Sequence, residues 1–190
     1  VCGIELNVVS GAAMLGVRSA IITKIPANKI GHFVRNKIRY GNVSDDYLVY
    51  DDSNEARLGV YYYESGAYPR KSSVIYDRAR SSMCSLSLGE LPDDIFEKTK
   101  VFHISSITLA INPQLRDTAL QIIKRFHDAG ALISFDVNYR AALWSEDEAR
   151  AVIEDVFNYV DFLFVSEETS RRMLRRTGSL EDIMKGYSND

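Results

Sequence analysis

Polar side chains follow an apolar run in the second half of the chain and can form a ligand site. Residues 132–137 are rich in β-branched and aromatic side chains, which predicts a strand buried on both faces of a sheet. Asp136, Asn138 and Arg140 lie at its carboxyl end, where ligands bind in α/β sheets. The alternative is an ordinary strand-to-helix turn, in which Asp136 and Asn138 serve local hydrogen bonds.

A second group of candidate residues is rich in tyrosine. Residues 61–63 are consecutive tyrosines and alternate between the faces of a predicted strand. Tyr76 and Arg78 are two positions apart and therefore share one face. A tyrosine hydroxyl beside a guanidinium suits a carboxylate or a polyhydroxy acid. The alternative is a sheet face on which these residues are exposed to solvent and bind no ligand.

Other signals are weaker. Gly3 and Asn7, at the head of a helix of small residues, can turn backbone N–H groups and an amide toward a ligand. The chain has no phosphate-binding glycine motif and no nucleophile–base pair, and Cys2 and Cys84 lack metal-ligand spacing. Its histidines, which no acidic or cysteine motif accompanies, are His32, His103 and His127.

The composition is that of a globular domain and excludes several classes of protein. The chain has 190 residues, 46% hydrophobic and 26% charged, with a formal net charge of −3. This charge argues against a nucleic-acid-binding protein. We expect no membrane span and no signal peptide, and two cysteines fit a reducing, cytoplasmic compartment. The arginines at 171, 172, 175 and 176 predict a solvated helix face.

The first half of the chain predicts two helices and several short strands. Residues 6–15 predict a helix that Gly16 ends, and residues 20–25 predict a strand. Residues 30–40 predict a helix with Ile30, Phe33, Val34 and Ile38 on one face. The next three segments, residues 47–50, 58–64 and 73–77, are strand-like and have no helix between them. They predict an antiparallel meander that forms a flap or lid.

The second half alternates strands and helices. Strands are predicted at 101–105, 132–137 and 162–165. Helices are predicted at 113–129, at 145–157 with a capping box of Ser145 and Glu148, from Ser166 through Arg176, and from 180 to 185. Together with residues 20–25, the strands predict a four-stranded parallel sheet. The expected domains are a main α/β domain over residues 1–45 and 81–190, and a β lid over residues 46–80.

Taken together, these segments resemble the ribokinase-like (PfkB) carbohydrate kinases, and among them most closely the 2-keto-3-deoxygluconate kinases. The resemblance runs the whole length of the chain and rests on the order and spacing of its pieces. These are Gly3-Ile-Glu-Leu-Asn7, Arg57-Leu-Gly-Val-Tyr-Tyr-Tyr-Glu64, Val74-Ile-Tyr-Asp-Arg-Ala79, Phe102-His-Ile-Ser105, Phe135-Asp-Val-Asn-Tyr-Arg140 with Leu143-Trp144, and Phe164-Val-Ser-Glu-Glu168.

The resemblance implies ATP-dependent phosphoryl transfer to a hydroxyl of a sugar acid, with ATP and Mg²⁺ as cofactors of a complete family member. It implies a ribokinase-like parallel sheet flanked by helices, with a lid that closes over the substrate and can pair two subunits as a homodimer. Carried over residue by residue, the resemblance implies that Gly3 and Asn7 contact the hydroxyl end of the substrate and that Tyr61 lines the lid. Tyr76 and Arg78 then hold the carboxylate and keto end, and Arg140 faces the acid group or the moving phosphoryl group. Asn138 and Ser166 lie on the nucleotide and phosphate side.

Several positions depart from the family pattern. Cys2-Gly3 stands where the family usually has two glycines, Pro26-Ala27-Asn28 replaces its Gly-Asp-Asp segment, and Thr169 replaces an acidic residue that helps to organise Mg²⁺. The resemblance places the catalytic Asp beyond residue 190, so we assign no catalytic residue and no metal ligand to this chain. Because the sequence does not begin with methionine and its last strand has no successor, we expect it to be part of a longer protein.

Two hypotheses follow from these matches and departures. The first is a part of a sugar-acid kinase that is inactive by itself. The second is a degenerate, non-catalytic protein that binds ligands or other proteins. Within the family, a fructokinase-type sugar kinase is a further alternative, but Tyr76 with Arg78 argues for an acid because an arginine is costly to bury without an anion.

Overall fold

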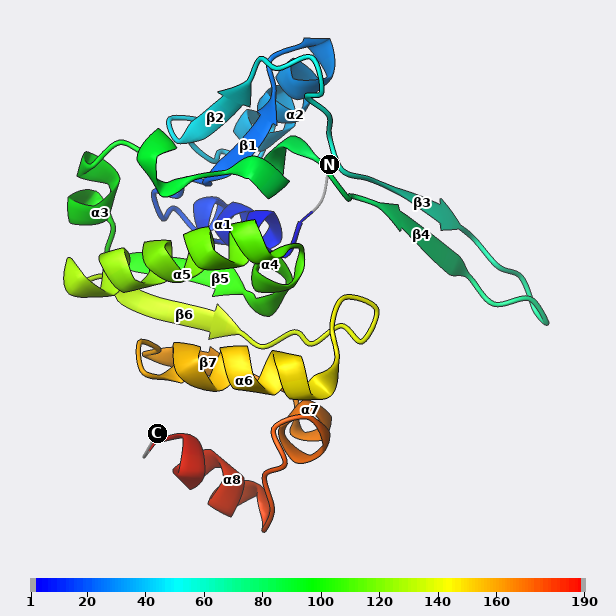
Figure 1. Cartoon of the computed structure of the whole chain (residues 1–190), viewed down its shortest axis with the longest axis vertical. Coiled ribbons are helices and arrows are strands. Elements are labelled where there is room, and N and C mark those ends of the chain that lie inside the picture. Colours follow the sequence, from blue (N-terminus) through cyan, green and yellow to red (C-terminus); the bar gives the residue numbers. More distant parts are fainter. Residues whose placement is uncertain (1–2, 189–190) are drawn as a thin grey trace. The chain divides into compact units, whose positions relative to one another are not determined.

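The computed structural model describes residues 3–188 and has an α/β architecture (Figure 1). Its contacts divide the chain into two compact units, Val1–Leu91 and Pro92–Asp190. Each unit contains helices and parallel strands that pair within that unit, and the first also contains one antiparallel pair of strands. The predicted α/β class with a small antiparallel sheet is confirmed.

The first unit begins with an apolar helix and continues with a strand–helix–strand crossover. Its elements are α1 (Ile4–Met14), β1 (Thr23–Pro26), α2 (Lys29–Tyr40), β2 (Leu48–Asp51), β3 (Val60–Glu64), β4 (Ser73–Asp77) and two short 3-10 helices, η1 (Ser82–Ser85) and η2 (Leu88–Glu90). The predicted first helix is confirmed and begins earlier, at Ile4. It is followed by Gly16 with φ of +86°, a left-handed conformation that glycine adopts without strain.

The strands β1 and β2 form a parallel pair, which corrects the predicted meander. Thr23 lies opposite Leu48 and Pro26 lies opposite Asp51. The sequence pattern groups residues 47–50 with the tyrosine-rich strands, but a helix of 12 residues separates β2 from β1, and such a crossover joins parallel strands. The predicted strand over residues 20–25 is also shorter, because Ala20 forms only an isolated bridge with Ser44.

The helix α2 buries a different face from the one predicted. Ile38 is buried as expected, but Ile30 and Phe33 are 61% and 54% exposed. The buried side contains Gly31, where an added Cβ would lie 1.9 Å from the carbonyl oxygen of Pro26 in β1. The close approach of the two backbones therefore sets the orientation of the helix. Asn28 caps its first turn by accepting from the N–H groups of Ile30 and Gly31.

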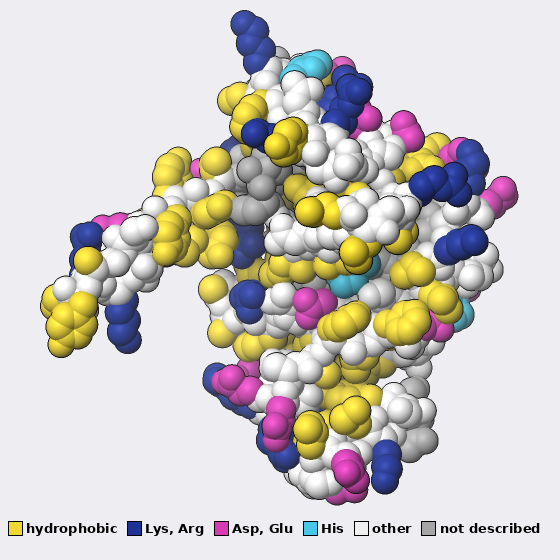
Figure 2. All heavy atoms as spheres, turned by 180° about the vertical axis from the view of Figure 1, so that it is seen from behind, with side chains coloured by type: hydrophobic (Ala, Val, Ile, Leu, Met, Phe, Trp, Pro, Cys, Tyr) yellow, Lys and Arg dark blue, Asp and Glu magenta, His cyan; other side chains and the backbone are white. Residues whose placement is uncertain are grey.

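The strands β3 and β4 form a two-stranded antiparallel hairpin. Val60 pairs with Asp77 and Tyr61 with Tyr76 in its register. Every residue of both strands is exposed, and Figure 2 shows hydrophobic side chains along this ribbon. The antiparallel part of the predicted meander thus consists of two strands. A hairpin of this size buries too little apolar surface to be stable in isolation, so its base must be anchored.

The second unit alternates strands and helices. Its elements are α3 (Asp94–Lys98), β5 (Val101–Ser105), α4 (Ser106–Ala110), α5 (Pro113–Asp128), β6 (Leu132–Asp136), α6 (Glu146–Phe157), β7 (Phe162–Phe164), α7 (Glu167–Arg172) and α8 (Leu180–Tyr187). The strands form one parallel sheet in the order β5-β6-β7. Three of the four strands predicted for a common sheet therefore pair as expected, whereas the fourth, β1, pairs with β2.

The core of the second unit lies between its sheet and helices. Phe126 of α5 is buried, and its ring centroid lies 4.6 Å from that of Phe96 and 4.3 Å from that of Phe102. Ile133 and Phe135 of β6 are fully buried as well. Each such side chain contributes about 1.5–3 kcal/mol to the free energy of folding. The central strand is thus held firmly up to its carboxyl end.

One predicted helix cap and one predicted helix boundary differ in the structure. Ser145 accepts the N–H of Glu148 as expected, but the Glu148 carboxylate pairs with Arg116 and so does not complete a capping box. The helix α7 ends at Arg172, and Arg175 has φ of +54°. Of the four arginines predicted to form a solvated face, three are exposed and ion-paired, with Arg172 on Glu146 and Arg175 on Asp147. Arg176 is half-buried instead, with its guanidinium 4.9 Å from the centroid of the Tyr187 ring. Within residues 3–188, no helix has the length and apolarity required to cross a bilayer.

The close approach at Gly31 generates a stability prediction. Gly31→Ala places a methyl group against the Pro26 carbonyl, so we expect it to destabilise the protein by about 2 kcal/mol. The matched control is Gly11→Ala, since Gly11 of α1 has open space around its Cβ position and alanine favours a helix by about 0.5–1 kcal/mol. Thermal unfolding measures both, and an unchanged or raised Tm for Gly31→Ala would contradict this account.

Candidate functional site

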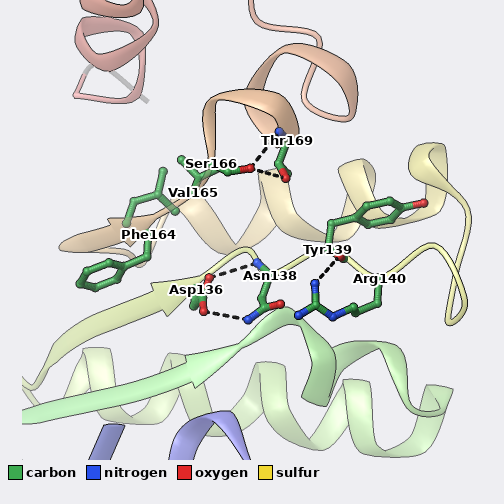
Figure 3. Close-up of a pocket in the computed structure, with 9 residues that line it drawn as sticks. Asp136, Asn138, Tyr139, Arg140, Phe164, Val165, Ser166 and Thr169 are labelled. Atoms are coloured by element: carbon green, nitrogen blue, oxygen red, sulfur yellow. Dashed lines mark hydrogen bonds between the residues drawn. The ribbon is translucent and has the colours of Figure 1, made fainter. Parts of the chain in front are cut away.

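The carboxyl end of β6 is shaped by a compact set of hydrogen bonds. Asn138 has φ of +25°, an unusual backbone conformation for a residue with a side chain. The Asp136 carboxylate accepts both the backbone N–H and the side-chain amide of Asn138, at 3.1 and 3.0 Å (Figure 3). The Val137 N–H donates to the Phe164 carbonyl of β7 at 2.9 Å. Asp136 and Asn138 therefore build the turn, and both form the local bonds considered from the sequence.

Arg140 lies in the turn that this pair creates. Its guanidinium is exposed and donates to the Tyr139 carbonyl at 3.2 Å. No acidic side chain within residues 3–188 forms an ion pair with it. The charge of Arg140 is therefore left available for an anion, which a guanidinium can bind with two parallel hydrogen bonds.

An open cavity of about 510 Å³ adjoins this turn. Its walls are Asp136, Asn138, Tyr139 and Arg140 on one side and residues 163–166 with Thr169 on the other (Figure 3). Ser166 accepts the backbone N–H of Thr169 at 3.1 Å, and its hydroxyl donates to the Thr169 hydroxyl at 2.9 Å. The structure therefore brings Asn138, Arg140 and Ser166 of the predicted site to one cavity.

The hairpin in the first unit carries the other predicted group. Tyr61 and Tyr76 are cross-strand partners with ring centroids 6.1 Å apart. The Arg78 guanidinium lies 4.6 Å from the centroid of the Tyr76 ring, in a cation–π contact. Gly59 permits this arrangement, because a Cβ at that position would lie 3.1 Å from the Arg78 Cβ. The three predicted side chains therefore share one end of the hairpin.

The base of the hairpin is anchored by residues that the sequence did not single out. Arg57 donates to the Asp77 carboxylate and to the Ala79 carbonyl, both at 2.7 Å. Its backbone exchanges hydrogen bonds with Ser82. Hydrogen bonds from the hydroxyl of Ser82 and, to a smaller extent, from that of Ser53 lower the pKa of Asp51 below its usual value. Arg57 and Ser82 lie 25 positions apart, so no local pattern could have joined them.

The head of α1 holds the remaining predicted residues. Gly3 is the N-cap residue, and its carbonyl accepts the Asn7 N–H at 2.9 Å. Asn7 is exposed. Cys2, one of the departures from the family pattern, lies outside the described residues. This group and the hairpin group belong to the first unit, whereas the cavity at β6 belongs to the second.

Other proteins share both the sequence and the fold. A family model for pfkB family carbohydrate kinases matches residues 2–189. The chain is 36% identical over 188 residues to a 2-dehydro-3-deoxygalactonokinase from Haloferax volcanii, which covers 99% of this chain and 58% of that protein. The crystal structure of 2-dehydro-3-deoxygluconokinase from Thermotoga maritima matches with a TM-score of 0.87 and 30% identity, over 99% of this chain and 58% of that one.

A third match is a sugar kinase solved with a nucleotide. An uncharacterised sugar kinase from Pyrococcus horikoshii in complex with ATP has a TM-score of 0.81 and 27% identity, over 92% of this chain and 56% of that one. The chain thus spans a little over half the length of the proteins it matches. The resemblance and the ribokinase-like fold predicted from the sequence are confirmed.

The turn at β6 generates the second prediction. Asp136→Ala removes the acceptor of both Asn138 bonds, so we expect a loss of about 1–2 kcal/mol in the free energy of unfolding, and a smaller loss for Asp136→Asn. Asp117→Ala, at an exposed position of α5, is the control and should stay within about 0.5 kcal/mol of the original chain. Urea unfolding would disprove the role of the turn if Asp136→Ala matched this control.

Proposed function

This chain belongs to the pfkB family of carbohydrate kinases, and we propose that it forms the sugar-acid-binding part of an ATP-dependent kinase. The proposed substrate is a 2-keto-3-deoxy sugar acid, such as 2-keto-3-deoxygluconate or 2-keto-3-deoxygalactonate. The names of two relatives support this class, since dehydro and keto denote the same carbonyl group. The reaction is transfer of a phosphoryl group from ATP to a hydroxyl of the substrate.

The observation that carries the proposal is the state of Arg78. Two other arginines near or within the hairpin, Arg57 and Arg70, are paired with Asp77 and Glu64 at 2.7 Å. Arg78 instead lies over the Tyr76 ring, and no carboxylate of the described chain pairs with it. A carboxylate ligand would supply the missing counter-charge, and the Tyr76 hydroxyl would add a directional hydrogen bond. A neutral sugar, such as the substrate of a fructokinase, would leave the charge of Arg78 without a counter-ion.

The proposed roles of the other residues follow the same chemistry. Gly3 and Asn7 would contact the hydroxyl end of the substrate, and Tyr61 would line the lid. Arg140 would stabilise negative charge on the acid or on the phosphoryl group in transit, with Asn138 and Ser166 on the phosphate side. Phosphoryl transfer depends mainly on positioning and on neutralising charge, which suits an unpaired guanidinium beside a cavity.

The described residues form no ready-made cluster of metal ligands. Residues 3–188 contain no group of three or more His, Cys, Asp or Glu side chains placed to hold a metal ion. Thr169, at the position where the family has an acidic residue, is bonded to Ser166. No step assigned to this chain therefore runs through Mg²⁺, and its proposed part in the reaction is to bind and orient the sugar acid and the phosphate groups.

The exposed hairpin supports a homodimer in which two copies of the chain pair through their lids. All side chains of β3 and β4 are exposed, including a tyrosine run at residues 61–63. Aromatic residues are enriched at protein interfaces, and two exposed strands offer unpaired backbone edges.

A second candidate function is that of a degenerate kinase-like binding protein. Two departures from the family pattern serve structural purposes here: Asn28 caps α2, and Thr169 bonds to Ser166. Neither offers an acidic group to a substrate or a metal ion. A folded chain that binds no sugar acid would favour this candidate.

Isothermal titration with 2-keto-3-deoxygluconate tests the carboxylate role of Arg78. We expect binding to the 190-residue chain, and Arg78→Ala to weaken it at least about tenfold because a charge-assisted hydrogen bond is lost. Arg70→Ala is the matched control, since Arg70 lies in the same hairpin and pairs with Glu64. Equal loss in both variants, or tighter binding of fructose than of the acid, would contradict the proposal.

The same chain tests where catalysis resides. Because we assign the catalytic base to no described residue, we expect no ATP-dependent phosphorylation of 2-keto-3-deoxygluconate by the purified chain. A coupled assay for ADP release, with mass analysis of the sugar, measures this. Sustained turnover that Arg140→Ala abolishes would show that the chain holds a complete catalytic site.

A further inference from the structure

Arg116 of α5 joins three segments of the second unit. Its Nε donates to the Leu109 carbonyl of α4 at 3.0 Å, and its Nη2 pairs with the Glu148 carboxylate of α6 at 2.8 Å. Its guanidinium carbon lies 5.3 Å from the centroid of the Trp144 ring. The side chain is only 19% exposed, so solvent screens these contacts less than those of the surface ion pairs.

Trp144 lies at the end of the loop that carries Arg140. The loop runs from β6 to α6, over residues 137–145. Trp144 is 5% exposed, and its carbonyl accepts the Tyr139 hydroxyl at 3.2 Å. Its indole N–H has no hydrogen-bond partner in the described part of the chain. Packing and the contact with Arg116 therefore hold the ring, and the ring in turn holds the far end of the loop.

The start of the loop is held independently. The Val137 N–H donates to the Phe164 carbonyl, and the Val137 carbonyl accepts the Ser106 hydroxyl. Asp136 then fixes Asn138. Between these bonds and Trp144, the Leu143 N–H donates to the Arg140 carbonyl at 2.9 Å, a local turn. The position of Arg140 thus depends on both ends of the loop, and the far end depends on Trp144.

We propose that Arg116 is a positioning residue for Arg140, and that its guanidinium acts by stacking on Trp144 and so fixing the loop beside the cavity. Arg116 does not line the cavity itself. A lysine could keep the charge near Glu148, but it has no planar group to stack on the indole and cannot donate in two fixed directions. The inference rests on the proposed function only in its last step, that Arg140 binds the anionic ligand.

The loop itself can be observed without any ligand. Trp144 is the single tryptophan of the chain, so its fluorescence reports on this loop alone. In Arg116→Gln we expect greater quenching by acrylamide and a shift of the emission to longer wavelength, because the indole becomes more accessible to water. Arg116→Lys should fall between this variant and the original chain. Circular dichroism and thermal unfolding establish that each variant is folded at the temperature of the measurement.

The matched control is Arg125→Gln. Arg125 lies on the same helix, its guanidinium carbon is 4.3 Å from the Phe96 ring centroid, and it pairs with Asp93 at 2.6 Å. It therefore loses the same kinds of contact without touching the loop, and its tryptophan emission should equal that of the original chain. Equal quenching in Arg116→Gln and Arg125→Gln, or original quenching in Arg116→Lys, would overturn the stacking role.

Binding of 2-keto-3-deoxygluconate then tests the link to Arg140. We expect Arg116→Gln to lose about tenfold in affinity, and to lose nothing further when Arg140→Ala is already present, because both changes remove one interaction. Additive losses would overturn the link, since Arg116 would then act by another route. If the original chain binds no sugar acid, the proposed function fails, while the quenching experiment still decides whether Arg116 holds Trp144.

Discussion

The candidate site in the second unit depends on one local interaction, the pair of hydrogen bonds that the Asp136 carboxylate accepts from Asn138. Two hydrogen bonds stabilise a backbone conformation with positive φ, which asparagine adopts more readily than other residues with a side chain. This turn directs the chain out of the sheet, so that Tyr139 and Arg140 face the cavity beside β7. The rigid strand beneath it makes the turn effective, because Phe135 and Val137 on either side of Asp136 are fully buried.

Much of the fold follows from local patterns in the sequence. Buried strands such as β6 and capped helices such as α5 were predicted with small errors at their ends, because apolar periodicity and capping residues are local signals. The pairing of β2 with β1 was not predicted from the sequence, because strand pairing depends on the segment between the strands and not on their tyrosine content. The exposure of Ile30 and Phe33 was missed because Gly31, which has no side chain, determines which face of α2 is buried.

In the candidate site, too, local sequence patterns predicted the positions of side chains along the chain but not their contacts with distant residues. Asn138 and Arg140 were expected at the carboxyl end of a strand, whereas Ser166 was placed at the phosphate side only through the family resemblance; all three line one cavity. The residues that support the two groups came from elsewhere in the chain. Arg57 lies 20 positions from Asp77, and Arg116 lies 32 positions from Glu148. Such contacts leave no periodic trace, so an arginine that holds a structure together looks in the sequence like one that solvates a surface.

The hairpin has a consequence for how the protein behaves in concentrated solution. Both outer edges of a two-stranded ribbon present unpaired backbone groups, and here tyrosine and valine side chains flank them. Such ribbons are templates for uncontrolled strand addition, which begins aggregation. Glu64, Arg70 and Lys71 place charge near the tip and act as gatekeepers there. The ion pair of Arg57 with Asp77 places charge at the base, but residues 61–63 and 74–76 between the two ends carry none. This middle stretch of the ribbon is therefore open to self-association, and it contains the tyrosines offered to a ligand.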